Sequence, residues 1–273
     1  MPRLAAVCIT FALLGCMTDL DEMWLVKDLR MLGIRATPPE LPQSAARLPP
    51  ITVDALVVDP TAPADRTYTW ELWACTVDSA LCDGAQVREL LRRDRTTLDG
   101  IRHEVVLSDE LRRRTIELLA PTGYSWAFVT LELRVFPDSG PVLRGVKQVL
   151  LRDVEFPEQP MDNPDLARVE VDGAPLTDPI QIDRCKNLTV AVWGGGDSQG
   201  VAWLDVYVSR GRVTSWETAG SNETAPDFTV SWNPCDEEGS APGDTAYLWL
   251  VARNGIGGID WVQVRVLIGG ASG

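Results

Sequence analysis

The feature that most constrains the fold of this chain is a repeated alternation of apolar and polar residues in short segments. In residues 262–266 the valines alternate with Gln263 and Arg265. A period of two is typical of a strand with one buried face, and many such segments separated by turn residues are typical of a β-sandwich. Residues 155–164 contain three prolines and divide the pattern in two. We interpret them as a stiff linker.

The pattern predicts an all-β protein with two domains in tandem. The first domain covers residues 28–154, the second covers residues 165–268, and residues 269–273 form a tail. Strands are expected at residues 27–35, 51–58, 68–77, 125–136 and 142–154 in the first domain, and at 166–171, 188–193, 201–209, 228–232, 246–253 and 261–267 in the second.

Two segments of the first domain are expected to be helical instead. They are residues 85–95 and residues 109–120. Ser108 can cap the second helix, and Asp109 and Glu110 are favourable in its first turn. The first domain is therefore predicted to carry a short helical insertion.

The N-terminus has the pattern of a secretory signal. Arg3 precedes an apolar run over residues 4–14. This run is too short to span a bilayer, which needs about 20 residues. One interpretation of Cys16, which follows the run, is a chance cysteine after an ordinary signal peptide.

The tetrapeptide Leu13-Leu14-Gly15-Cys16 resembles the lipobox of bacterial lipoproteins. The resemblance implies that residues 1–15 are removed and that the Cys16 thiol receives a diacylglyceryl group such as one carrying palmitate. Residues 16–27 would then be an acylated tether. The next residue is methionine rather than aspartate, which by the sorting rule of enteric bacteria implies the outer membrane.

Four of the six cysteines remain once Cys8 leaves with the signal and Cys16 is acylated. An even number in an exported chain predicts two disulfides. Three pairings are open, and the favoured one places one bridge in each half of the chain: Cys75–Cys82 and Cys185–Cys235. A zinc site is the alternative, but the C-x-x-C spacing is missing and His103 is the sole histidine. No metal or cofactor is expected.

The formal net charge is −14, and removal of the signal with its Arg3 makes it −15. A balance this acidic argues against nucleic acid as a partner, because phosphates require a basic surface. It also argues against electrostatic adhesion to anionic lipid. The contact with the membrane is therefore expected to be made by the acyl chains.

The closing segment AYLWLVARNGIGGIDWVQVRVLI resembles the last two strands of PKD and related immunoglobulin-like domains. WAFVTLELRVFPDSGPVLRGVKQVLL repeats that hairpin in the first domain, and YTWELWAC resembles the middle of the same fold. The resemblance implies two immunoglobulin-like (PKD-like) β-sandwiches. In such a fold the second and fifth strands pair, which implies that Cys185 and Cys235 meet at the end of that pair. VKDLRMLGIRATPPE, after the lipobox, resembles envelope lipoproteins of the myxobacterial kind.

Few residues suggest chemistry. His103 is the one candidate base for a nucleophile, and no G-x-S-x-G motif is present. The glycine-rich residues 194–200 lack the Lys-Ser/Thr end of a phosphate loop. Asp197 and residues 235–239 offer oxygens to calcium without the spacing of a known calcium loop. Trp216 lies in loop-like sequence and is a candidate exposed residue for contact with a glycan.

These observations favour a lipid-anchored, non-catalytic envelope lipoprotein. It would act as a binding or structural module for an envelope protein or a polysaccharide. The alternative is an envelope hydrolase that uses a pair of carboxylates, since acidic residues are plentiful.

Overall fold

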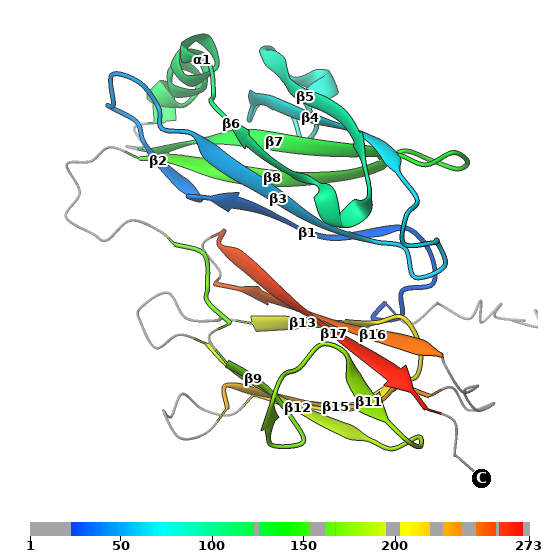
Figure 1. Ribbon diagram of the computed structural model, residues 1–273. Helices are drawn as coiled ribbons and strands as arrows, with labels where there is room; N and C mark the ends of the chain where they lie inside the picture. The colour runs from blue at the N-terminus through cyan, green and yellow to red at the C-terminus, as the bar shows by residue number, and fades with distance from the viewer. Residues whose placement is uncertain are drawn as a thin grey trace, which may run out of the picture.

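Two β-sandwiches stacked on one another make up this chain in the computed structural model (Figure 1). The structure describes residues 23–122, 126–152, 162–166, 168–194, 203–218, 226–235, 244–254 and 257–269. The prediction of an all-β fold with two tandem sandwiches is confirmed. Among these residues no helix is both long enough and apolar enough for a membrane span.

The first sandwich consists of a three-stranded and a five-stranded sheet. The three-stranded sheet has the order β1–β3–β6, with β1 Arg30–Thr37, β3 Ile51–Val58 and β6 Arg102–Val105. The five-stranded sheet has the order β2–β8–β7–β4–β5, with β2 Glu40–Pro42, β4 Tyr68–Thr76, β5 Arg88–Thr96, β7 Trp126–Phe136 and β8 Leu143–Arg152. The β2–β8 pair is parallel and the other pairs in this sandwich are antiparallel.

One α-helix, α1 (Asp109–Leu119), covers the end of the first sandwich that lies far from the second (Figure 1). The Ser108 hydroxyl accepts a hydrogen bond from the Leu111 amide at 3.1 Å, which confirms the predicted cap. The side chain of Leu111 is fully buried in the core of the first sandwich. Three short 3-10 helices complete the described elements of this domain: η1 Cys82–Gly84, η2 Leu98–Gly100 and η3 Ala120–Thr122.

The predicted helix at 85–95 is wrong, because Arg88–Thr96 form strand β5. Val87, Leu90 and Leu91 have the three- and four-residue spacing of a helical stripe, which explains the prediction. In the structure this segment instead pairs with β4 along its whole length. Val87 and Leu91 pack against the core and Leu90 stays exposed. The backbone pairing offered by β4 therefore overrides the local pattern.

The second sandwich is formed by a five-stranded and a four-stranded sheet. The five-stranded sheet has the order β10–β9–β12–β15–β14, with β9 Arg168–Val171, β10 Ala174–Pro175, β12 Leu188–Trp193, β14 Arg212–Thr218 and β15 Phe228–Asn233. The four-stranded sheet has the order β11–β17–β16–β13, with β11 Ile180–Ile182, β13 Trp203–Val208, β16 Thr245–Arg253 and β17 Ile259–Ile268. Strand β12 pairs with β15 antiparallel, as the resemblance implied.

The segment that precedes each sandwich is held by hydrogen bonds at the boundary between the two sandwiches. The amide of Val26 donates to Val208 O, and the amide of Val208 donates to Trp24 O, each at 2.8 Å. Trp24–Val26 therefore extend the β13 edge of the second sandwich. A tether of the predicted kind would end before Trp24, not at residue 27. At the other crossing, Asn163 donates to Ala36 O of β1 and accepts from the Ile259 amide of β17.

Candidate binding site at the domain seam

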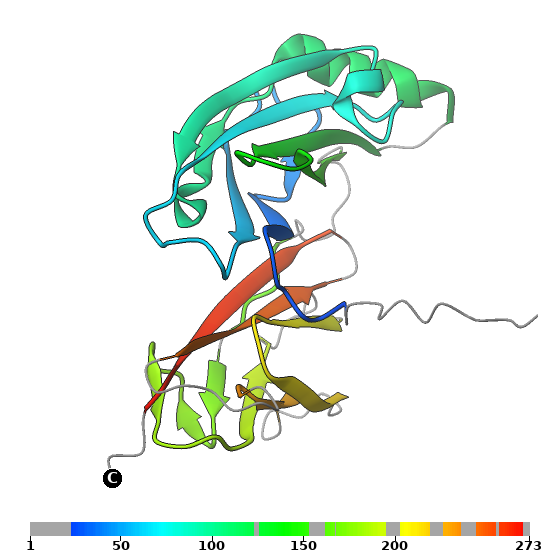
Figure 2. The same ribbon diagram turned by 90° about the vertical axis from the view of Figure 1, so that its right-hand side faces the viewer.

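The two sandwiches meet through a buried apolar cluster, which we call the seam. It consists of residues from β1 and β3 of the first domain, β16 and β17 of the second, and the N-terminal segment: Val26, Leu32, Leu56, Val58, Trp249, Val251 and Ile259. In both ribbon views the β1–β3–β6 sheet of the first sandwich faces the β16–β17 pair of the second (Figures 1 and 2). The domains are therefore joined by a shared core as well as by a linker.

Local structure explains why β1 and β17 can approach so closely. Leu32 occupies a β-bulge of β1, between the pairs made by Met31 and Gly33, and bulges re-aim side chains. The Leu32 side chain joins the seam, whereas Ile34 of the same strand joins the core of the first sandwich. A Cβ on Gly33 would lie 2.7 Å from Ile259 Cδ1, so a larger residue there would displace the end of the Ile259 side chain.

Arg35 adds a polar clamp at the edge of the seam. Its guanidinium hydrogen-bonds the Asp260 carboxylate of β17 and lies 3.3 Å from Asp54 Oδ2 of β3. The same group lies 4.5 Å from the centre of the Trp261 ring. One side chain of β1 thus contacts an acid from each sandwich and an aromatic face of the second.

One side of the seam opens into a cavity of about 400 Å³, which we call the basic pocket. Its walls come from β1, β8, β13, β16 and the turn before β17. Among the described residues, the lining includes three cationic side chains, Arg144, Lys147 and Arg253, and no acidic one. Trp203 borders the pocket with an exposed fraction of 46%. Pockets at domain interfaces are common ligand sites in proteins.

Lys147 is the unusual residue of the basic pocket. It is 8% exposed, and no hydrogen bond or ion pair of its ammonium group occurs within the described ranges. A Cβ on Gly257 would lie 3.8 Å from Lys147 Nζ, so the side chain of this β8 residue reaches across to the second sandwich. Burial, and in smaller part repulsion from Arg253, lowers the pKa of Lys147 to about 8.

The other two cations of the basic pocket have partners. Arg253 Nε donates to Asp205 Oδ2 at 2.8 Å, and Arg253 Nη2 donates to Leu32 O at 3.3 Å. Arg144 donates to Glu132 and to Asp83, each at 2.6 Å. Lys147 is therefore the one lining cation whose charge is uncompensated among the residues that the structure describes.

The opposite side of the seam opens into a second cavity, of about 580 Å³. We call it the aromatic pocket because Tyr247, Trp249 and Trp261 line its wall from the second sandwich. Tyr247 and Trp249 stack with ring centres 5.6 Å apart, and Trp249 Nε1 donates to Gln263 Oε1 at 2.8 Å. The facing wall comes from β3 and the loop that follows it.

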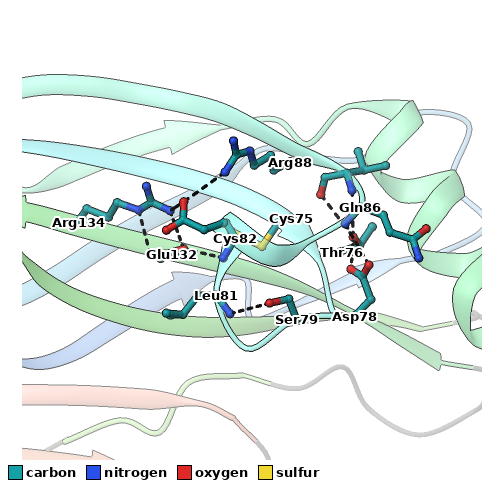
Figure 3. Close-up of a disulfide and its surroundings, with 12 residues drawn as sticks. Cys75, Thr76, Asp78, Ser79, Leu81, Cys82, Gln86, Arg88, Glu132 and Arg134 are labelled. Atoms are coloured by element: carbon teal, nitrogen blue, oxygen red, sulfur yellow. Dashed lines mark hydrogen bonds and ion pairs between the residues drawn. A yellow bond between two sulfur atoms is a disulfide. The ribbon is translucent and has the colours of Figure 1, made fainter.

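The first predicted disulfide, Cys75–Cys82, joins β4 to η1 and is present as expected (Figure 3). The loop it closes is also held by a carboxylate, because Glu132 of β7 accepts from the Cys82 amide at 2.7 Å. Glu132 is fully buried and also accepts from Arg134 and Arg144. Asp83 accepts from the same two arginines. The disulfide loop is thus attached to the β7–β8 pair.

Among the described carboxylates, Glu132 and Asp83 share two hydrogen-bond donors, Arg134 and Arg144. Their charge state bears on the hydrolase alternative. Burial alone would raise the pKa of Glu132, but hydrogen bonds from Arg134, the Cys82 amide and Arg144 outweigh it and hold the pKa below its ordinary value. Hydrogen bonds from Arg144 and Arg134 lower the pKa of Asp83. A general acid needs a raised pKa, so this pair is suited to structure and not to acid catalysis.

The other predicted site residues have different outcomes. Cys185–Cys235 is also present as predicted, with the Cα atoms 5.8 Å apart. Trp216 lies in strand β14, opposite Val230, so its predicted position in a loop is wrong. That segment alternates poorly because β14 is an edge strand with a bulge before Ser215. Cys16 and Asp197 lie outside the described residues.

His103 and the calcium hypothesis gain no support from the described part of the chain. His103 is half-buried on β6, opposite Val53, and no hydroxyl or thiol in the described ranges hydrogen-bonds to it. No cluster of three potential metal ligands occurs among the described residues. Most of residues 235–239 lies outside those residues.

The seam itself was not predicted, although the sequence contains a signal for it. Strand β16 reads TAYLWLVAR, in which the residues of both faces are apolar, so a half-buried strand cannot account for it. Ala246, Leu248 and Leu250 belong to the second core, while Trp249 and Val251 belong to the seam. A strand that is apolar on both faces in a two-domain chain indicates a covered outer face.

Comparison with known proteins leaves the family open. No family model matches the sequence, and no curated protein matches it. Among solved structures, the chain is similar to domains 1–6 of the surface layer protein SbsC, with 14% identity, a TM-score of 0.25 and coverage of 91% of this chain and 29% of that one. It is also similar to the EC3-6 cis-dimer structure of protocadherin gammaB7, with 13% identity, a TM-score of 0.23 and coverage of 89% and 48%.

A third similarity is to the native conformation of E. coli alpha-2-macroglobulin, with 16% identity, a TM-score of 0.25 and coverage of 89% of this chain and 16% of that one. In each case this chain spans less than half of the other. TM-scores near 0.25 carry no argument about function. The description of the fold therefore rests on the sheets and cores of this chain.

Proposed function

We propose that this protein is a lipid-anchored, non-catalytic envelope lipoprotein whose two sandwiches act as a binding module for a polysaccharide or protein partner. The observation that carries the binding role is the seam, which joins the domains and leaves a pocket on each side. Because this apolar core is shared by the two sandwiches, it fixes the two walls of each pocket relative to one another. This preorganisation reduces the entropic cost of capturing a ligand.

The anchor and the location rest on the sequence. The lipobox-like end of the signal supports acylation of Cys16 at the outer membrane, in a bacterium of the myxobacterial kind. Two disulfides agree with export, because such bridges persist in oxidising compartments. The acidic net charge of −14 supports attachment by acyl chains without electrostatic help from anionic lipid.

The test of the anchor is fractionation of cells that express the Cys16→Ser variant. The proposal predicts that this variant is lost from the membrane fraction and no longer incorporates labelled palmitate. Cys8→Ser is the matched control, because it removes the other cysteine of the N-terminal segment and should leave both readouts unchanged. Retention of Cys16→Ser in the membrane fraction would disprove acylation at this residue.

The test of the binding role is capture from detergent-solubilised envelope, together with a glycan array probed with the purified protein. A retained polysaccharide or a single enriched envelope protein is the expected result. The comparison is a Val251→Asp variant. It introduces a charge into the buried seam and should therefore no longer retain the partner. If neither assay retains anything, the binding role is wrong.

A further inference from the structure

A buried ammonium group without a counter-charge favours the binding of an anion. Lys147 is 92% buried, since its exposed fraction is 8%, and it lines the basic pocket. An unpaired charge in such a position is costly, and proteins normally pair it or bind an ion. Because Arg144 and Arg253 are compensated by their own carboxylates, an anion entering the pocket would be attracted chiefly to Lys147.

The surroundings of Lys147 restrict which anions fit. Trp203 and Arg253 are cross-strand partners on β13 and β16, so their side chains share the face that borders the pocket. The Trp203 indole is 46% exposed and offers a flat apolar surface next to the cationic floor. A ligand that satisfies both needs one anionic group and one ring with an apolar face.

Size and net charge narrow the choice further. A cavity of about 400 Å³ lies at the lower end of the range for small-molecule sites, which suits one or two sugar rings. A net charge of −14 repels densely charged polyanions and acidic peptides at long range. It repels a single carboxylate carried by otherwise neutral sugars much less.

We propose that the basic pocket binds a carboxylate-bearing sugar unit of a polysaccharide, with the carboxylate on Lys147 and the ring against Trp203. This inference rests on the proposed binding function and specifies its ligand. Arg253 would act as a second donor at the rim, because Asp205 and Leu32 O occupy only some of its five N–H groups. The remaining wall, from β1, is apolar and would pack against the rest of the sugar.

The first experiment is isothermal titration of the full soluble chain with glucuronic acid and galacturonic acid, and with glucose as the neutral counterpart. We expect a uronic acid to bind at least tenfold more tightly than glucose. Lys147→Met should lower the affinity for the uronic acid at least tenfold and leave glucose unchanged. Trp203→Ala should weaken both sugars. Lys186→Met is the matched control, because Lys186 is exposed and paired with Asp172 on the second sandwich.

A second measurement keeps the test valid if a variant is perturbed. The chain has three lysines, so trace acetylation followed by mass spectrometry reports on each. A bound uronic acid should protect Lys147 from acetylation and leave Lys186 unprotected. Equal binding of glucose and uronic acids, undiminished binding by Lys147→Met, or lack of protection would each overturn the inference.

Tetraglutamate is the probe for the competing class of ligand. Tighter binding of tetraglutamate than of either uronic acid, with the same dependence on Lys147, would replace the sugar by an acidic peptide and overturn the proposal. If all three acids fail while the envelope capture retains a partner, the inference about the basic pocket is wrong and the broader binding role stands.

Discussion

Replacement of Lys147 by methionine should stabilise the protein at neutral pH and should do so in a pH-dependent way. Methionine has a similar length and keeps the apolar part of the side chain, but it removes the buried ammonium group. The charged group that acts on this ammonium from the packed elements is Arg253 of β16, which disfavours its charge. The substitution therefore removes a penalty without breaking an ion pair.

The magnitude follows from the pKa of Lys147, which is about 8 in the folded chain instead of 10.5. This difference corresponds to about 3 kcal/mol of destabilisation when both states are protonated. Between pH 8 and 10.5 the unfolded chain binds more protons than the folded chain, so the stability of the wild type rises with pH. At pH 9.5 about 2 kcal/mol of the penalty should be relieved. The advantage of Lys147→Met should shrink accordingly.

Urea unfolding followed by tryptophan fluorescence at pH 7 and at pH 9.5 measures this effect. The difference in free energy of unfolding between Lys147→Met and wild type should fall by about 2 kcal/mol between the two pH values. Lys186→Met is the control and should show no such change, because its ammonium is exposed. A difference that does not depend on pH would refute the reasoning, since it would mean that Lys147 titrates normally.

Three further substitutions test the seam, the buried carboxylate and the larger disulfide. Leu32→Ala should cost about 2 kcal/mol and split a single calorimetric unfolding transition into two, because it removes a buried contact between the domains. Glu132→Gln should cost about 3 kcal/mol in urea unfolding at pH 7, and the loss should vanish as the pH falls below about 4.5 through the lowered folded pKa. The double change Cys185→Ser, Cys235→Ser should cost about 4 kcal/mol in the same assay, because its bridge closes a loop of 50 residues.

Two of these predictions have a matched comparison. Leu72→Ala removes an equally buried leucine from the core of the first sandwich and should lower stability without separating the domains. Loss of the Cys75–Cys82 bridge, which spans seven residues, should cost only about 2 kcal/mol. One transition in Leu32→Ala, a loss from Glu132→Gln that persists at low pH, or equal costs for the two bridges would contradict the corresponding prediction.

Strands that alternate cleanly could be located from the sequence, and those that depend on a partner could not. Residues 51–58 and 188–193 were predicted with the observed bounds, because apolar runs of that length between turn residues have few other solutions. The segment at 85–95 is predicted to be a helix because Val87, Leu90 and Leu91 have helical spacing, whereas its conformation is decided by the backbone of β4. The edge strand β14 was missed for the related reason that it pairs with β15 on one side only.

The binding site was less predictable than the fold for a similar physical reason. Lys147 is one of three lysines and stands in an ordinary alternating strand, so its burial follows from the approach of β1 and of the second domain, which the local sequence does not reveal. Trp203 and Arg253 become neighbours through the register of β13 and β16, which are far apart in the sequence. The cysteines were the exception, because their even number and their distribution between the two halves favoured the pairing that is observed.

The short pairing of Trp24–Val26 with β13 has a consequence for the order in which the parts of the chain fold. These residues precede the first sandwich in the chain, yet their partner Val208 belongs to the sandwich that follows it. The first sandwich can form its own core early, but its N-terminal segment must wait, unpaired, for the second. Completion of the seam is therefore a late event that requires both domains to have folded. A chain that lacks the second domain would expose the apolar side chains of Val26 and Leu32 to solvent.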